Sequence, residues 1–254
     1  MVLSIYTLIY VMKLIIDIGN TNAKLAVYDL KHQVDFFVTP KEDFNKVIKQ
    51  VLLKYEKIKN VILSSVSDCD ISILKKNFTD RKILILDCNF KFPFTNNYKT
   101  LKTIGLDRLV LVSAALDKFP NKNVLVIDAG TCITYDYIDS KKNYHGGAIS
   151  PGLRMRYESL NRQTKNLPLL DPKMPNTMIG NSTKNSIHSG VVYGIINEIE
   201  GVINQYNKEF VDLTVVLTGG DANFLCKQLK SSIFVFSNFL LEGLNFLLEF
   251  NSKK

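Results

Sequence analysis

The chain has 254 residues, 46% of them hydrophobic and 22% charged, with a formal net charge of +8 at pH 7. These values are ordinary for a soluble globular protein of one large or two medium domains. The excess of lysine is scattered and forms no basic stripe with interleaved aromatic residues, so we expect no nucleic-acid partner, although a basic surface helps attract anionic substrates. The four cysteines lack Cys-x-x-Cys spacing, which argues against a zinc site and indicates reduced thiols in the cytoplasm.

The first eleven residues are apolar but lack a charged leader region and a small-residue cleavage site. Lys13 and Asp17 interrupt the apolar run that follows, so a membrane span is not expected either. We interpret residues 1–11 either as an artefact of the assigned start site, with Met12 as the true start, or as a loose extension outside the fold.

Short β-branched runs and helical periodicity alternate through the first half of the chain, which indicates an α/β domain with a mixed sheet. Residues 88–103 are polar and irregular and are expected to form a loop near a site. The elements predicted here are strands at 13–16, 23–27, 31–39, 61–66 and 83–86, and helices at 41–56, 71–78 and 104–119.

A linker at 120–123 divides the chain into predicted domains at 12–119 and 120–254. Glycines at 190, 194 and 201 weaken a helix intrinsically, so we expect them to allow close packing against another element. The second half is predicted to contain a hairpin at 124–139, a strand at 144–149, a helix start at 153, a loop at 164–181, a long helix at 182–206, a final strand at 214–217 and a tail helix at 239–250.

The first predicted strand runs into the segment Asp17-Ile-Gly-Asn-Thr-Asn-Ala-Lys24. Its glycine permits close backbone approach, exposed amides bind oxyanions, Asp17 can hold Mg²⁺ and Lys24 can reach a terminal phosphate. Alone, the segment is equally well explained as an asparagine-rich hairpin turn. The same Asp-x-Gly pattern recurs after another apolar run at Asp128, with Thr131 and Thr134 behind it. Two such copies indicate two related domains with a nucleotide in the cleft between them.

A second group of residues, Gly105-Leu-Asp107-Arg108, opens a predicted helix. Asp107 and Arg108 are interpreted either as a capping aspartate beside a surface arginine or as a general base beside a cation that binds a carboxylate substrate. Tyr98 is either a loop aromatic that packs down or a wall of the substrate pocket. Thr183 is explained by a capping role at the long helix. No P-loop, dinucleotide-binding or nucleophile-elbow motif is present.

Five motifs in order resemble the type III pantothenate kinase family across residues 12–250. The resemblance implies the acetate/sugar kinase–actin ATPase (ribonuclease H-like) fold, with two similar domains, and phosphorylation of pantothenate by ATP in the cytoplasm. The motifs are Asp17-x-Gly-Asn-Thr-x-x-Lys24, Gly105-x-Asp107-Arg108, Asp128-x-Gly-Thr131-x-x-Thr134, Gly146-Gly147-x-Ile149-x-Pro151-Gly152 and Thr218-Gly-Gly-Asp-Ala222.

The resemblance also implies a role for each matching residue. Asp107 would be the general base, Asp128 would hold a monovalent cation, K⁺ or NH₄⁺, and Asp17 would hold Mg²⁺ through the phosphates. Thr183 would reach pantothenate from the partner in a homodimer. ATP would be bound by Asp17, Ile18, Gly19, Asn20, Thr21, Asn22, Ala23, Lys24 and Thr131, and pantothenate by Tyr98, Gly105, Leu106, Asp107, Arg108 and Thr183. Cys132 departs from the family's usual small residue.

Three other functions fit parts of the pattern. The first is a kinase of the same superfold that acts on another hydroxylated acid or a sugar, because a fold does not determine a substrate. The second is a non-catalytic regulatory relative, which is disfavoured because Lys24, Asp107 and Asp128 are all present. The third is an actin-like or chaperone-like ATPase, whose lid insertions would need a longer chain.

Overall fold

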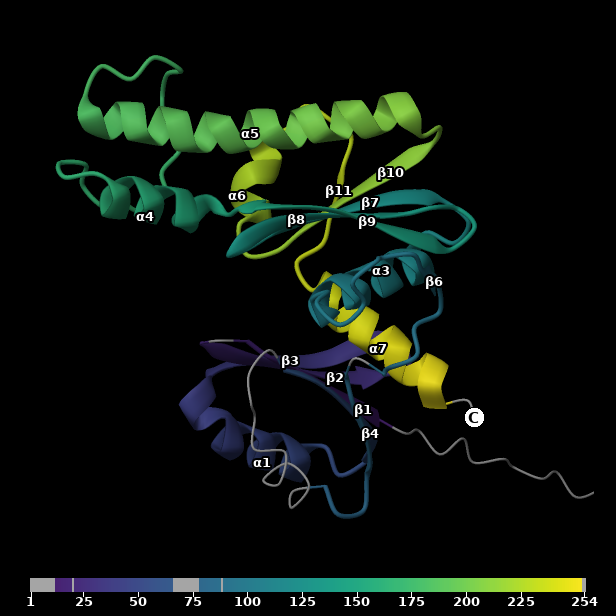
Figure 1. Cartoon of the computed structure of the whole chain (residues 1–254). Helices are drawn as coiled ribbons and strands as arrows, with labels where there is room; N and C mark the ends of the chain where they lie inside the picture. Colours follow the sequence, from purple (N-terminus) through teal and green to yellow (C-terminus); the bar gives the residue numbers. More distant parts are fainter. Residues whose placement is uncertain (1–11, 20, 66–77, 88, 253–254) are drawn as a thin grey trace, which may run out of the picture. The chain divides into compact units, whose positions relative to one another are not determined.

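The computed structural model describes residues 12–19, 21–65, 78–87 and 89–252, which form two compact units (Figure 1). Among the described residues, those from 12 to 92, from 105 to 110 and from 240 to 252 form unit 1, and those from 93 to 104 and from 111 to 239 form unit 2. The domain boundary expected between residues 119 and 120 stays a prediction. The expected extension at 1–11 and most of the helix expected at 71–78 lie outside the described residues.

Unit 1 is built on a five-stranded sheet with the strand order β3-β2-β1-β4-β5. Strand β1 pairs antiparallel with β2 and parallel with β4, which makes it the central strand and explains its continuous apolar sequence. The elements assigned to this unit are β1 (Met12–Ile18), β2 (Asn22–Asp29), β3 (His32–Pro40), the 3₁₀ turn η1 (Lys41–Asp43), α1 (Phe44–Lys54), β4 (Ile58–Ser65), β5 (Lys82–Ile85), residues 106–110 of α3 (Leu106–Lys118) and residues 240–252 of α7 (Phe239–Ser252).

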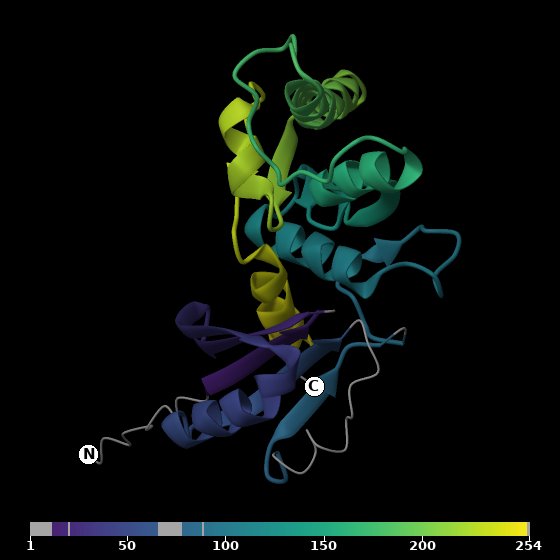
Figure 2. The same cartoon turned by 90° about the vertical axis from the view of Figure 1, so that its left-hand side faces the viewer.

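The two faces of this sheet bury different partners because side chains alternate along a strand. Helix α1 lies along one face, where its buried residues pack against Leu14 and Ile16 of β1 (Figure 2). Ile15 points to the opposite face and packs there with Val110 of α3 and Leu244 of α7. Asp17, two residues after Ile15, therefore lies on the face that carries the start of α3.

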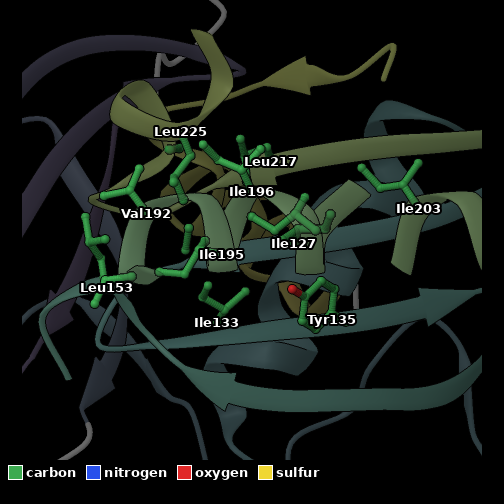
Figure 3. Close-up of a cluster of buried hydrophobic side chains, with 14 of the residues drawn as sticks. Ile127, Ile133, Tyr135, Leu153, Val192, Ile195, Ile196, Ile203, Leu217 and Leu225 are labelled. Atoms are coloured by element: carbon green, nitrogen blue, oxygen red, sulfur yellow. The ribbon is translucent and has the colours of Figure 1, made fainter. Parts of the chain in front are cut away.

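Unit 2 has a six-stranded sheet with the order β11-β10-β7-β8-β9-β6, and α5 lies across one of its faces (Figure 1). Figure 3 shows the core beneath this helix, where Ile195 and Ile196 meet Ile127 and Leu217 of the sheet. The elements are β6 (Thr95–Asn96), residues 111–118 of α3, β7 (Asn123–Ala129), β8 (Cys132–Ile138), β9 (Asn143–Pro151), α4 (Leu153–Gln163), α5 (Thr183–Glu209), β10 (Leu213–Thr218), α6 (Ala222–Leu225), η2 (Cys226–Gln228) and β11 (Phe234–Val235).

The two sheets repeat one topology, as the paired Asp-x-Gly motifs predicted. In each unit a central strand pairs antiparallel with the strand that follows it, and that strand pairs antiparallel with the next. On its other side the central strand pairs parallel with a later strand. Asp17 is the penultimate residue of β1 and Asp128 is the penultimate residue of β7. The two aspartates thus occupy equivalent positions in equivalent strands.

The structure corrects three expectations. The strand at 214–217 is not the final one, because the short strand β11 follows and pairs with β10. The cap of α5 is Ser182, whose hydroxyl accepts from the backbone N–H of Asn185, and Thr183 is the first helical residue. The glycines of α5 do not pack closely within the described chain: a Cβ at 190 or 201 would meet no atom within 4 Å.

No helix among the described residues is long and apolar enough to cross a membrane.

Candidate active site

The turn between β1 and β2 brings Asp17 and Lys24 together. They are paired across the antiparallel ladder, so their side chains share one face of the sheet. The turn is closed by a hydrogen bond of 2.9 Å from the N–H of Gly19 to the carbonyl of Asn22. Asn20, expected to bind ATP, lies outside the described residues, whereas Ile18, Gly19, Thr21, Asn22 and Ala23 are in this hairpin.

Asp17 has a strongly perturbed pKa. Burial raises the pKa of its carboxyl group from the usual 3.8 to about 6, Lys24 opposes the rise, and the negative charge of Asp107 adds to it. The Asp107 carboxylate must therefore be near enough to interact electrostatically with Asp17. A carboxylate destabilised in this way is a favourable ligand for a cation, because a bound cation would offset the lost hydration.

Asp107 and Arg108 lie in the first turn of α3. The Asp107 carboxylate accepts a hydrogen bond of 2.9 Å from the N–H of Arg108, and the helix dipole favours a negative charge here. A Cβ at Gly105 would stand 2.3 Å from Asp107 Oδ1, so the glycine leaves the space that this carboxylate occupies. Leu106 packs against the core of unit 1 and anchors the turn. Arg108 is only 4% exposed, which contradicts the alternative of a surface arginine.

In unit 2, Asp128 is flanked by two threonines in ladder register, Thr134 on β8 and Thr218 on β10. The Thr218 hydroxyl donates to the carbonyl of Phe236 at 2.7 Å. The Thr134 hydroxyl oxygen is buried and has no hydrogen-bond partner within the described part of the chain. A carboxylate beside an unsatisfied hydroxyl oxygen offers the oxygen ligands that a hard cation prefers.

Two turns near the end of β7 each need a glycine. Gly219 has a φ of +97°, and a Cβ there would stand 2.4 Å from the Ala129 carbonyl oxygen and from Asp128 Oδ1. A Cβ at Gly152 would stand 2.3 Å from the carbonyl oxygen of Thr131. Burial raises the pKa of Asp221, which lies in the same turn as Gly219. Thr131 is exposed at this crowded edge, where backbone can approach a ligand closely.

Two other predicted site residues of unit 2, Tyr98 and Thr183, lie far from these turns in the sequence and contact other residues. The ring of Tyr98 rests against Gly146 of β9 and stacks on Tyr144. Thr183 lines a pocket of about 950 Å³ between α4 and α5, together with Arg156 and Ser186. Sequence reasoning did not identify Tyr144 as a contact of Tyr98. Alternation along β9 gave no signal for it, because the pairing of β9 with β8 shifts register between Tyr144 and Gly146.

Solved structures define the class of protein. The chain aligns with a hexokinase of the ROK class from Thermus thermophilus at a TM-score of 0.54 and 12% identity, covering 95% of this chain and 100% of that one. It aligns at 0.62 and 22% identity with a Campylobacter jejuni protein described provisionally as a Baf family transcriptional activator, with the same coverage. These likenesses and the repeated sheets establish the acetate/sugar kinase–actin ATPase fold.

Sequence comparison is more specific. The family model for type III pantothenate kinase matches residues 13–205. A type III pantothenate kinase from Christiangramia forsetii is 49% identical over 243 residues, which cover 94% of this chain and 99% of that protein. The one from Flavobacterium johnsoniae is 46% identical over 234 residues, covering 92% and 96%. The chain belongs to the type III pantothenate kinase family.

Proposed function

We propose that the protein transfers the γ-phosphoryl group of ATP to pantothenate and forms 4′-phosphopantothenate, the first step of coenzyme A biosynthesis, in the cytoplasm. The observation that carries this proposal is that Asp17 is paired with Lys24 across the β-ladder and that the charges of both Lys24 and Asp107 act on its carboxyl group. Phosphoryl transfer depends mainly on positioning and on neutralisation of charge, and these three groups supply a metal ligand, a phosphate ligand and an acceptor for a proton.

The hairpin from Asp17 to Lys24 is proposed to bind the phosphates of ATP, and Thr131 is proposed to contact the nucleotide from unit 2. Asp17 would hold Mg²⁺ through the phosphates, and the ion would neutralise charge on the transferred group. The raised pKa of Asp17 fits this assignment, because the ionised carboxylate lacks full compensation in the ligand-free protein. Lys24 is exposed, as a side chain that reaches a phosphate must be.

Asp107 is proposed as the general base that accepts the proton of the primary hydroxyl of pantothenate. The Arg108 N–H donates to one of its carboxylate oxygens, and the second oxygen would accept the proton of the substrate. Gly105 and Leu106 would line the same pocket, and Arg108 would attract the pantothenate carboxylate. Tyr98 would form a further wall of this pocket.

Asp128 is proposed to hold K⁺ or NH₄⁺. Its neighbour Thr134 offers a buried hydroxyl oxygen with no partner among the described residues, which fits a site built from oxygen ligands. The bound cation would supply positive charge beside the nucleotide phosphates. Asp128 contributes the negative charge that retains it, and the close turn at Gly219 keeps its carboxylate in place.

A homodimer is proposed in which Thr183 of each subunit contacts the pantothenate of the other. Thr183 is exposed and lines the pocket between α4 and α5, so it is available to a ligand or to a second copy. Gly190 and Gly201 lie further along α5 with no atom within 4 Å of a Cβ position. A neighbouring helix could approach closely along this side.

The experiment is a coupled assay of ADP release with pantothenate, in the absence and presence of K⁺ or NH₄⁺. We expect turnover that requires pantothenate and is stimulated by the cation. Asp107→Asn should lower kcat by about 10²–10⁴-fold while ATP binding is almost unchanged. Near wild-type kcat in this variant would refute the base assignment. Folded protein without pantothenate-dependent turnover under either cation would point to another hydroxylated acid or to a regulatory role.

A further inference from the structure

The backbone of Tyr98 is fastened to the edge of the unit 2 sheet. The short strand β6 pairs parallel with β9, with Asn96 opposite Tyr144. The N–H of Asn97 donates to the carbonyl of Tyr144 at 3.0 Å, and the N–H of Tyr98 donates to Asn96 Oδ1 at 3.0 Å. These bonds determine where the side chain of Tyr98 leaves the loop.

The ring of Tyr98 stacks on the ring of Tyr144, with centroids 6.4 Å apart and planes at 22°. Tyr144 is fully buried, and its hydroxyl donates to Asp136 Oδ1 at 2.6 Å, so its ring is held from the core side. Phe94 packs on the same ring with a centroid distance of 6.0 Å. Tyr144 is thus a rigid platform for Tyr98.

Gly146 limits Tyr98 from another direction. Its φ is +89°, and a Cβ there would stand 2.8 Å and 3.1 Å from Cδ2 and Cε2 of Tyr98. Both distances are shorter than ordinary contact between carbon atoms, so the ring occupies space that any other residue at position 146 would fill. The pairing of β9 with β8 shifts register between Tyr144 and Gly146, so the backbone of β9 is irregular where these two residues contact Tyr98.

We propose that Gly146 and Tyr144 are positioning residues that determine how the ring of Tyr98 contacts pantothenate. The inference rests on the proposed function, in which Tyr98 is a wall of the pantothenate pocket. Gly146→Ala should raise the KM for pantothenate about tenfold, because a displaced ring no longer makes this contact in the same place. The KM for ATP and the kcat at saturating pantothenate should change less than about twofold, since neither depends on this ring.

A double-mutant cycle separates displacement of Tyr98 from general damage to the fold. In a Tyr98→Leu background the added methyl group no longer meets a ring, so Gly146→Ala should change the KM for pantothenate by less than about twofold. An equal rise in KM in both backgrounds would overturn the proposal. If Gly146→Ala does not fold, Tyr144→Leu replaces it and should give the same selective rise. Tyr144→Phe is its matched control, because it also loses the bond to Asp136 but keeps the platform ring.

The position of the ring can also be followed without activity. The chain contains no tryptophan, so Tyr98→Trp introduces a single indole at the site. Adding Gly146→Ala should shift the indole emission to the red, because the ring leaves Tyr144 for water. A red shift together with no pantothenate turnover by the wild-type protein would confirm the positioning and refute the proposed substrate. Unchanged emission together with an unchanged KM in active enzyme would refute the positioning and leave the substrate assignment intact.

Discussion

Replacement of Asp17 by asparagine should make the ligand-free protein more stable at neutral pH while it abolishes turnover. Burial raises the pKa of Asp17 from 3.8 to about 6. Below pH 3.8 Asp17 is protonated in both the folded and the unfolded protein, and the fold has its full stability. Part of that stability is lost as the pH rises through about 6, because the unfolded protein ionises more readily. Above that pH the ionised carboxylate destabilises the fold by up to about 3 kcal/mol. The asparagine amide must be buried in its place, which also costs free energy, so we expect a net gain in the free energy of unfolding of about 1–2 kcal/mol.

The assay is thermal and urea unfolding at pH 5 and pH 8 without Mg²⁺ or nucleotide. A gain of about 1–2 kcal/mol corresponds to a rise in Tm of roughly 2–8 °C for a chain of this size. The gain should be present at pH 8 and mostly absent at pH 5. The control is Glu56→Gln, a carboxylate-to-amide change at an exposed position of unit 1, which should be neutral within about 0.5 kcal/mol. A loss of stability at pH 8, or an equal gain at both pH values, would show that burial does not destabilise this carboxylate.

Three further substitutions test the site and its support. Gly105→Ala places a methyl group 2.3 Å from the Asp107 carboxylate, so kcat should fall about 10- to 100-fold with little change in Tm; unchanged kcat would show that the carboxylate can move without loss. Lys13→Met leaves the partner carboxylate of Glu249 without its cation and should destabilise the protein by about 2–4 kcal/mol in urea unfolding, with partial recovery on adding Glu249→Gln. Gly219→Ala combines a φ of +97° with a backbone clash, so Tm should drop by several degrees and the cation stimulation should weaken; wild-type values of both would contradict the account of this turn.

Local chemistry made much of the fold predictable. The run before Asp17 and the run before Asp128 are both apolar, short and followed by a glycine turn, and both form central strands. Helices α3 and α5 begin within a few residues of the expected positions, because their start signals are polar residues next to periodic apolar ones. The repeated topology followed from the repeated motif, since identical local constraints select identical supersecondary structure.

Elements that depend on distant contacts could not be predicted in the same way. Strand β11 has two residues and no alternating pattern, and it forms because Phe236 bonds back to Leu217 and Phe234 packs on Phe119. The burial of Arg108 likewise has no signal in its neighbours. In α5 the glycines suggested close packing, whereas in the described chain two of them face open space.

The sequence by itself determined the family, the order of the motifs and the residue types proposed to bind phosphate, because these depend on turns of a few residues. The tertiary structure decided how those residues influence one another. It raised the pKa of Asp17 by burying it on the face that carries α3, and it placed Tyr98 against Gly146 of another strand. Burial and steric exclusion arise between residues that are far apart in the chain, so spacing along the sequence carries no record of them.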